Sequence, residues 1–237
     1  MTLIVTLLMA GMAYTQPVLV EDETNSQRES DSNEVTPEHI ELWSASSTEN
    51  PLIPMEDCVL SDMVVDSSGN TYVTGSFKEK IQFGDTILSN SGYAMFVAQL
   101  HSNGIWGWAV QSTGTDVRSH ALTLDDAEQN LFVVGSAIFN NTFGPYPFVT
   151  NETSLFVTSV STLDGTFNYL RTPVYGNSSA QSVIARPGGG VHVSGTHFND
   201  LRLPNLSFVP PATFEDAFVA SMDGEGNWLW ITSTSCD

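Results

Sequence analysis

The stretch Val65-Asp66-Ser67-Ser68-Gly69-Asn70-Thr71-Tyr72-Val73-Thr74-Gly75-Ser76-Phe77 decides the fold class, because the chain carries two further versions of it. Gly75 recurs as Gly135 and again as Gly195, at a constant spacing of 60 residues. Each glycine follows a short run of β-branched or aromatic side chains. A constant period of this size indicates one supersecondary unit that is repeated along the chain.

Further landmarks recur in the same order within each copy. A Phe-Gly pair recurs once and then degenerates, a Phe-Val-Ala segment recurs with small changes, and a later glycine precedes two aromatic residues. The landmarks are Phe83-Gly84, Phe143-Gly144 and Leu203-Pro204; Phe96, Phe156 and Phe218; Gly104, Gly165 and Gly226; and Trp106 with Trp108, Phe167 with Tyr169, and Trp228 with Trp230. So many matches in one order disfavour chance similarity between β-rich segments.

Each copy contains four short strand-like runs. In the second copy these are residues 121–124, 131–136, 155–160 and 167–171. Asp, Asn and Gly separate the runs, and these residues favour tight turns because they tolerate positive φ. Both faces of the runs are apolar, as in sheets that are covered on two sides. The sequence therefore predicts an all-β chain, a β-propeller-like array of about three four-stranded antiparallel blades that forms an incomplete propeller.

The pattern resembles the SBBP-type β-propeller repeats of bacterial and archaeal secreted or surface proteins. The resemblance covers about residues 59–235. The first copy carries it on Asp66, Gly69, Asn70, Tyr72, Val73, Gly75, Phe77, Phe83, Gly84, Phe96, Val97, Ala98, Leu100, Gly104 and Trp108, and the third on Asp216, Phe218, Val219, Ala220, Asp223, Gly226 and Trp230. The third copy departs at Arg186, Gly190 and His192. The resemblance implies a fold and says little about activity.

The residues before the copies form two segments. Residues 1–16 contain an uncharged apolar run that is too short to span a bilayer, which predicts a secretory signal peptide. An ordinary buried N-terminal segment is the alternative, because no Lys or Arg precedes the run. Residues 17–50 predict an acidic disordered spacer, with a segment near Trp43 that resembles the last strand of a preceding blade. Residues 51–237 then hold three repeats, at about 59–116, 117–177 and 178–237.

The chain is strongly acidic, with 27 Asp and Glu against 7 Lys and Arg and a formal net charge of −20. Nucleic acids and anionic membrane surfaces are disfavoured as partners because both require basic patches. We also expect no membrane insertion of the mature chain. Asp66, Asp126 and Asp223 lie in predicted turns and are candidate calcium ligands, but their spacing lacks the alternating pattern of a calcium loop, which favours ordinary turn residues. We expect no other cofactor.

Neither a metal site nor a catalytic constellation is evident. His192 and His197 are five positions apart, which places them on opposite faces of a strand. The chain has no nucleophile elbow, phosphate loop or Cys–His pair, and the three glycines 188–190 precede a strand rather than a helix. A non-enzymatic role is therefore expected.

Two cysteines and four glycosylation sequons complete the candidate residues. Cys58 and Cys236 bracket the copies, and free or intermolecular cysteines are favoured over a bond because three blades do not close a ring. Asn140, Asn151, Asn177 and Asn205 begin Asn-x-Ser/Thr sequons in predicted turns.

Two classes of function follow from these observations. The first is a secreted or cell-surface module, extracellular and non-enzymatic, that binds a protein or a glycan or acts as a structural spacer. The alternative is a propeller-fold enzyme that acts on polysaccharide through acidic residues at the channel mouth. Three blades leave two uncovered apolar faces, which predicts either a truncated chain or an oligomer through the open blade faces.

Overall fold

A computed structural model of the chain describes residues 58–206 and 215–234. These residues form strands and turns without a helix, so none of them belongs to a helix that could cross a membrane. The predicted leader, the predicted acidic spacer and the predicted strand near Trp43 lie outside the described residues. The strands are β1 (Cys58–Val65), β2 (Thr71–Phe83), β3 (Thr86–Leu100), β4 (Trp106–Leu124), β5 (Asn130–Phe143), β6 (Tyr146–Ser161), β7 (Phe167–Arg171), β8 (Tyr175–Ala185), β9 (Val191–Arg202), β10 (Glu215–Met222) and β11 (Trp228–Ser233).

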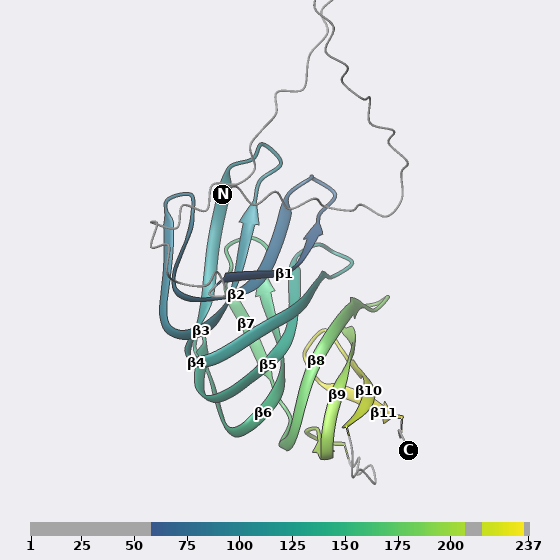
Figure 1. The fold of residues 1–237 in the computed structure, drawn as a ribbon. Helices are drawn as coiled ribbons and strands as arrows, with labels where there is room; N and C mark the ends of the chain where they lie inside the picture. The colour runs from purple at the N-terminus through teal and green to yellow at the C-terminus, as the bar shows by residue number, and fades with distance from the viewer. Residues whose placement is uncertain (1–57, 207–214, 235–237) are drawn as a thin grey trace, which may run out of the picture. The chain divides into compact units, whose positions relative to one another are not determined.

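The strands form two antiparallel sheets. Strands β1 to β7 make a seven-stranded sheet in chain order, and β8 to β11 make a four-stranded sheet. The first sheet is curled (Figure 1). The all-β, antiparallel prediction is thus confirmed for the described residues. The sequence predicted separate four-stranded sheets, and only β8 to β11 have that form.

The difference arises because β4 belongs to two neighbouring groups of strands. Its residues from Trp106 to Gln111 pair with β3, and its residues from Ser112 onward pair with β5, with Asp116 pairing with both strands. Gly114 has a φ of 127°, and the β4–β5 register shifts beside it, so the strand bends without ending. We call residues 58–111 the first unit, 112–171 the second unit and 175–233 the third unit. The last boundary lies slightly before the predicted one, because β8 begins at Tyr175.

Three glycines lie at the same register in the three units. Each pairs with a phenylalanine of the next strand, in the pairs Gly75–Phe96, Gly135–Phe156 and Gly195–Phe218. On its other side each glycine faces a β-bulge, where a carbonyl oxygen lies 1.9 to 2.0 Å from where a Cβ would be. No residue with a side chain fits there without a backbone shift, which explains the constant glycine.

Long strands fold back on themselves at the end of the units opposite the short turns. Glu79 and Phe139 have positive φ values of 66° and 68°, and the strand registers shift beside both. As a result Phe143, at the end of β5, packs with ring centroids 4.9 Å from Phe156 and 6.2 Å from Phe167. We call the residues around these turning points the bend end: 77–79, 90–93, 114–116, 137–140, 150–154 and 175–177.

The units bury their apolar faces against one another. One buried cluster combines Tyr72, Met95 and Val97 of the first unit with side chains of the second, including Phe143 and Phe156. A second cluster joins the second and third units and includes Phe132, Val134, Leu155, Val157, Tyr169, Val193, Phe218 and Trp228. The repeat pattern predicts a core of eight residues, and six of them are buried: Val73, Phe96, Val133, Phe156, Val193 and Phe218. Trp108 is half-buried, and the prediction is wrong for Trp230, which is 44% exposed.

Candidate functional site

Short turns gather at the end of the units opposite the bend end. We call residues 66–70, 101–105, 125–129, 162–166, 186–190 and 223–227 the turn end. In the first of these turns the carboxylate of Asp66 accepts hydrogen bonds from the backbone N–H groups of Ser68 and Asn70, at 2.9 and 2.8 Å, and from the side chains of Asn70 and Tyr72. Asp223 accepts equivalent bonds from Glu225 and Asn227. Both carboxylates thus close their own turns.

These hydrogen bonds change the acidity of the two carboxyl groups. For Asp223 the backbone N–H of Asn227 is the main cause of a pKa below the ordinary value, because it stabilises the ionised form. For Asp66 desolvation opposes ionisation, but the bonds from Asn70, Tyr72 and Ser68 outweigh it and lower the pKa. Both side chains are therefore ionised at neutral pH and already occupied by N–H and O–H donors, an arrangement typical of turn residues rather than cation ligands.

The third aspartate named by the sequence has another role. Asp125, not Asp126, closes its turn by accepting from the backbone N–H groups of Gln129 and Asn130. The sequence signal was ambiguous because the two aspartates are adjacent. Asp126 instead accepts a 3.3 Å hydrogen bond from the backbone N–H of Gly188 in the third unit.

Another carboxylate, that of Glu128, links the second unit to the first. Glu128 accepts from both the backbone N–H and the hydroxyl of Ser67, at 2.9 and 2.6 Å. These five carboxylates, of Asp66, Asp125, Asp126, Glu128 and Asp223, therefore hold turns and neighbouring units in place. Among the described residues no three His, Cys, Asp or Glu side chains form a group that could hold a metal ion.

The two histidines of β9 lie on opposite faces, as their spacing predicted. His197 is buried beside Phe218, whereas His192 is half-exposed and its ring lies 5.6 Å from that of Trp230. Cys58 is exposed at the start of β1, and Cys236 lies outside the described residues, so their relationship stays a prediction.

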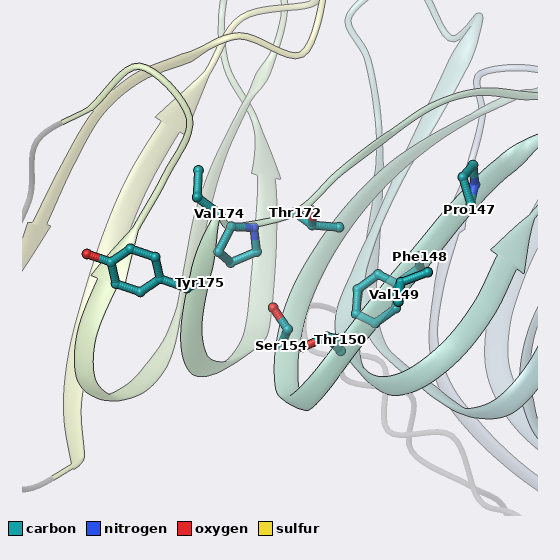
Figure 2. Close-up of a pocket in the computed structure, with 9 residues that line it drawn as sticks. Pro147, Phe148, Val149, Thr150, Ser154, Thr172, Val174 and Tyr175 are labelled. Atoms are coloured by element: carbon teal, nitrogen blue, oxygen red, sulfur yellow. The ribbon is translucent and has the colours of Figure 1, made fainter.

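A shallow pocket of about 250 Å³ lies near the bend end. Figure 2 shows it between β6 and the segment that leads from β7 into β8. Its lining mixes apolar side chains with hydroxyls: Pro147, Phe148, Val149, Thr150, Ser154, Thr172, Pro173, Val174 and Tyr175. Sequence reasoning did not find this pocket, because its two walls are some twenty residues apart in the chain and carry no shared motif.

The four sequon asparagines are all exposed. Asn140 follows the turning point at Phe139 and pairs with Val149 of the pocket wall. Asn151 lies where the β5–β6 pairing is interrupted, and Asn177 lies beside a register shift at the start of β8. Asn205 lies apart from them, after the end of β9, with a φ of 62°.

The outer face of the third unit is exposed at positions whose equivalents in the second unit are buried. Register places Phe132, Val134, Leu155, Val157 and Tyr169 of the second unit where the third unit has His192, Ser194, Ala217, Val219 and Trp230. The second-unit residues are all at most 9% exposed, whereas Val219 and Trp230 are 41% and 44% exposed. We call the five third-unit residues the open face. Ile184, which pairs with His192, adds a further exposed apolar side chain beside it.

The covered faces also show how one unit is held to the next. Trp108, on the fourth strand of the first unit, donates its indole N–H to the carbonyl oxygen of Thr162 and lies where a Cβ on Gly165 would be. Arg171, on the fourth strand of the second unit, donates to the carbonyl oxygens of Gly226 and Glu225. On the third unit the position of Trp108 and Tyr169 is taken by the exposed Trp230.

No known protein-family model matches the chain, and no curated protein matches its sequence.

Proposed function

We propose that the chain is a secreted or cell-surface, non-enzymatic module of propeller-type units that binds another protein. The observation that carries the proposal is the open face of the third unit. Val219 and Trp230 are exposed there, although the corresponding positions of the second unit are buried against its neighbour. An exposed apolar patch of this kind is typical of an interaction surface.

Three features support propeller-type units. Each unit has four antiparallel strands in meander order and a glycine opposite a phenylalanine, and in the first two units the fourth strand leads into the next unit. Neighbouring units cover one another with apolar faces, as propeller blades do. The repeated glycines and phenylalanines of the sequence fall at these positions, which supports the proposal of propeller-type units.

The covered faces indicate the chemistry of the partner. We propose that it presents a four-stranded β-unit of the same kind, with a glycine in the turn before its fourth strand. Trp230 would cover that glycine, as Trp108 covers Gly165, and would donate its indole N–H to a carbonyl oxygen of the turn. The five residues of the open face include no Asp, Glu, Lys or Arg, so burying them desolvates no carboxylate or basic side chain.

A non-enzymatic role is supported by the use of carboxylates at the turn end. Asp66, Asp125 and Asp223 close turns, while Glu128 and Asp126 join neighbouring units. A glycosidase needs two carboxylates that face each other across a substrate. The expected leader at residues 1–16 supports the extracellular location.

The experiment compares the purified chain with two single variants. Trp230→Ser removes the largest exposed side chain of the open face, and Leu163→Ser removes an 86% exposed leucine from a turn as the matched control. We expect the parent chain to bind a hydrophobic dye and to associate in sedimentation equilibrium. Trp230→Ser should weaken both signals, whereas Leu163→Ser should leave them unchanged.

The opposite result would overturn the proposal. A parent chain that is monomeric, unfolds in one cooperative transition and binds no dye would show that the open face needs no partner. A purely spacing role would then be the better description. Equal loss of dye binding in both variants would show that the dye does not report on this face.

A further inference from the structure

The asparagines of this chain fall into two structural groups. Seven of those with described side chains use the side-chain amide in hydrogen bonds: Asn70, Asn90, Asn103, Asn130, Asn141, Asn168 and Asn227. None of the seven begins an Asn-x-Ser/Thr sequon. All of these amides except that of Asn103, which only accepts from the backbone N–H of Ile105, donate through the side-chain nitrogen, and a bulky group on that nitrogen would break their contacts.

The sequon asparagines form the second group. The amides of Asn140, Asn151, Asn177 and Asn205 make no hydrogen bond within residues 58–206 and 215–234, and all four side chains are exposed. Adjacent residues show the contrast most directly. Asn141 is 3% exposed, and its side chain accepts from the backbone N–H groups of Thr115 and Asp116. The side chain of Asn140 is exposed and makes no hydrogen bond with the described residues.

We propose that these four asparagines carry N-linked glycans, and that three of the glycans cover the bend end with its pocket. The chemical requirement is a side-chain nitrogen that faces solvent in the folded chain, within an Asn-x-Ser/Thr sequence. All four positions meet it, and no other asparagine with a described side chain does. The inference rests on the secreted location proposed above, because N-glycosylation belongs to the secretory route.

Exposed apolar side chains surround the three sites at the bend end. Asn140 follows Phe139 and pairs with Val149, which are 49% and 75% exposed. Asn177 follows Tyr175, which is 44% exposed, and Asn151 follows Thr150 of the pocket wall. Figure 2 shows Val149 and Tyr175 on the two sides of the pocket. Glycans here would shield apolar surface from water and from other chains.

The glycan at Asn177 is compatible with a partner on the open face. Register places Asn177 where the second unit has Asp116, since they pair with Phe198 and Ile138 respectively. The side chain of Asp116 keeps 37% of its surface exposed although the face beside it is covered by the third unit. A group attached at this position therefore lies at the rim of such an interface and points outward.

The test expresses the full chain in a glycosylating secretory host, once with its own leader and once with a host leader. The secreted protein is treated with a peptide N-glycosidase in ¹⁸O water, and each converted asparagine is identified by peptide mass spectrometry. We expect conversion at all four sequons and at no other asparagine. Hydroxyl-radical footprinting should label Tyr175 less in the glycosylated protein than in the enzymatically deglycosylated protein.

Single Asn→Gln variants provide matched controls. Asn140→Gln should remove one glycan and leave the unfolding midpoint of the deglycosylated protein unchanged, whereas Asn141→Gln should keep all glycans and lower that midpoint. Secretion without conversion at Asn140, Asn151 and Asn177 would overturn the inference. Conversion that depends on the host leader would contradict the proposed secretion by the chain's own leader and leave the glycan assignment standing.

Discussion

The indole N–H of Trp108 donates to the carbonyl oxygen of Thr162 at 3.0 Å, which ties the fourth strand of the first unit to a turn of the second. The same indole lies against Gly165, where a Cβ would approach its ring to 2.6 Å. A hydrogen bond and a close ring contact thus act at one point of the interface. Trp108 is one of the side chains that hold the first two units together, and it should therefore be sensitive to two different substitutions.

We expect Trp108→Phe to lower the free energy of unfolding by about 1 kcal/mol, because it keeps most of the ring contact and leaves the carbonyl of Thr162 without its indole donor. Trp108→Ala should cost more, about 3 kcal/mol, since it also removes buried ring surface. Urea unfolding measures both values. Trp230→Phe is the control: Trp230 is 44% exposed and no described unit follows it, so its effect should stay below about 0.5 kcal/mol. Equal effects at Trp108 and Trp230 would contradict the interface role.

The strands could be predicted from the sequence because their signals are local. Gly75, Gly135 and Gly195 recur where a carbonyl oxygen leaves no room for a Cβ, so their spacing records a steric requirement directly. Tight turns are equally local, since Asp, Asn and Gly determine them within five residues. The antiparallel order followed from these two signals.

Other features depend on contacts between distant segments. The sharing of β4 between two units rests on Gly114, whose positive φ the sequence does not reveal. The pocket combines residues 147–154 with residues 172–175, and no motif links them. Trp230 was predicted as a core residue because it repeats the aromatic position of Trp108 and Tyr169. A following unit covers those two residues, whereas no described unit follows Trp230. Sequence similarity between the units predicted its environment wrongly, since burial depends on the neighbour.

Gly135→Ala should destabilise the chain by about 3 kcal/mol or more, because its Cβ would lie 1.9 Å from the carbonyl oxygen of Arg118 and the backbone of β4 would have to move. Gly224→Ala is the matched control, since the nearest atom to its Cβ would be the backbone nitrogen of Gly190 at 3.6 Å. Thermal unfolding of the two variants should separate them clearly. A similar melting temperature for both would show that the bulge beside Gly135 adapts.

Low pH should reduce the free energy of unfolding, partly because Asp66 and Asp223 become protonated. Their pKa values in the folded chain lie below the ordinary value of 3.8, so the folded state favours their ionised forms. Their contribution to stability is present above about pH 4 and is lost as the pH falls through the lowered pKa values. The double variant Asp66→Asn, Asp223→Asn should be less stable than the parent at pH 6 and show a shallower loss toward pH 2.

The matched control for this pH dependence is Asp85→Asn, in the turn between β2 and β3. The side chain of Asp85 makes no hydrogen bond within the described residues, so Asp85→Asn removes a carboxylate without removing a turn contact and should keep the parent's stability at pH 6. Urea midpoints at a series of pH values measure all three proteins. If the urea midpoint fell equally steeply with decreasing pH in the parent and the double variant, the two turn carboxylates would not be responsible for the loss of stability in acid.

Arg171 should be intolerant even of lysine. Its guanidinium donates through Nε to the carbonyl oxygen of Gly226 and through a terminal nitrogen to that of Glu225, at 2.8 and 2.9 Å, and lies 4.5 Å from the ring centroid of Tyr169. The planar fork can bond both carbonyls while it stacks on the ring, which an ammonium group cannot do. We expect Arg171→Lys to destabilise the chain by about 1 to 2 kcal/mol, and Arg171→Met by a similar amount, because the lost contacts depend on geometry more than on charge. Arg202→Lys, at an exposed arginine near the end of β9, is the control. If lysine restored most of the stability lost with methionine, positive charge rather than the paired hydrogen bonds would be what holds the second unit to the third.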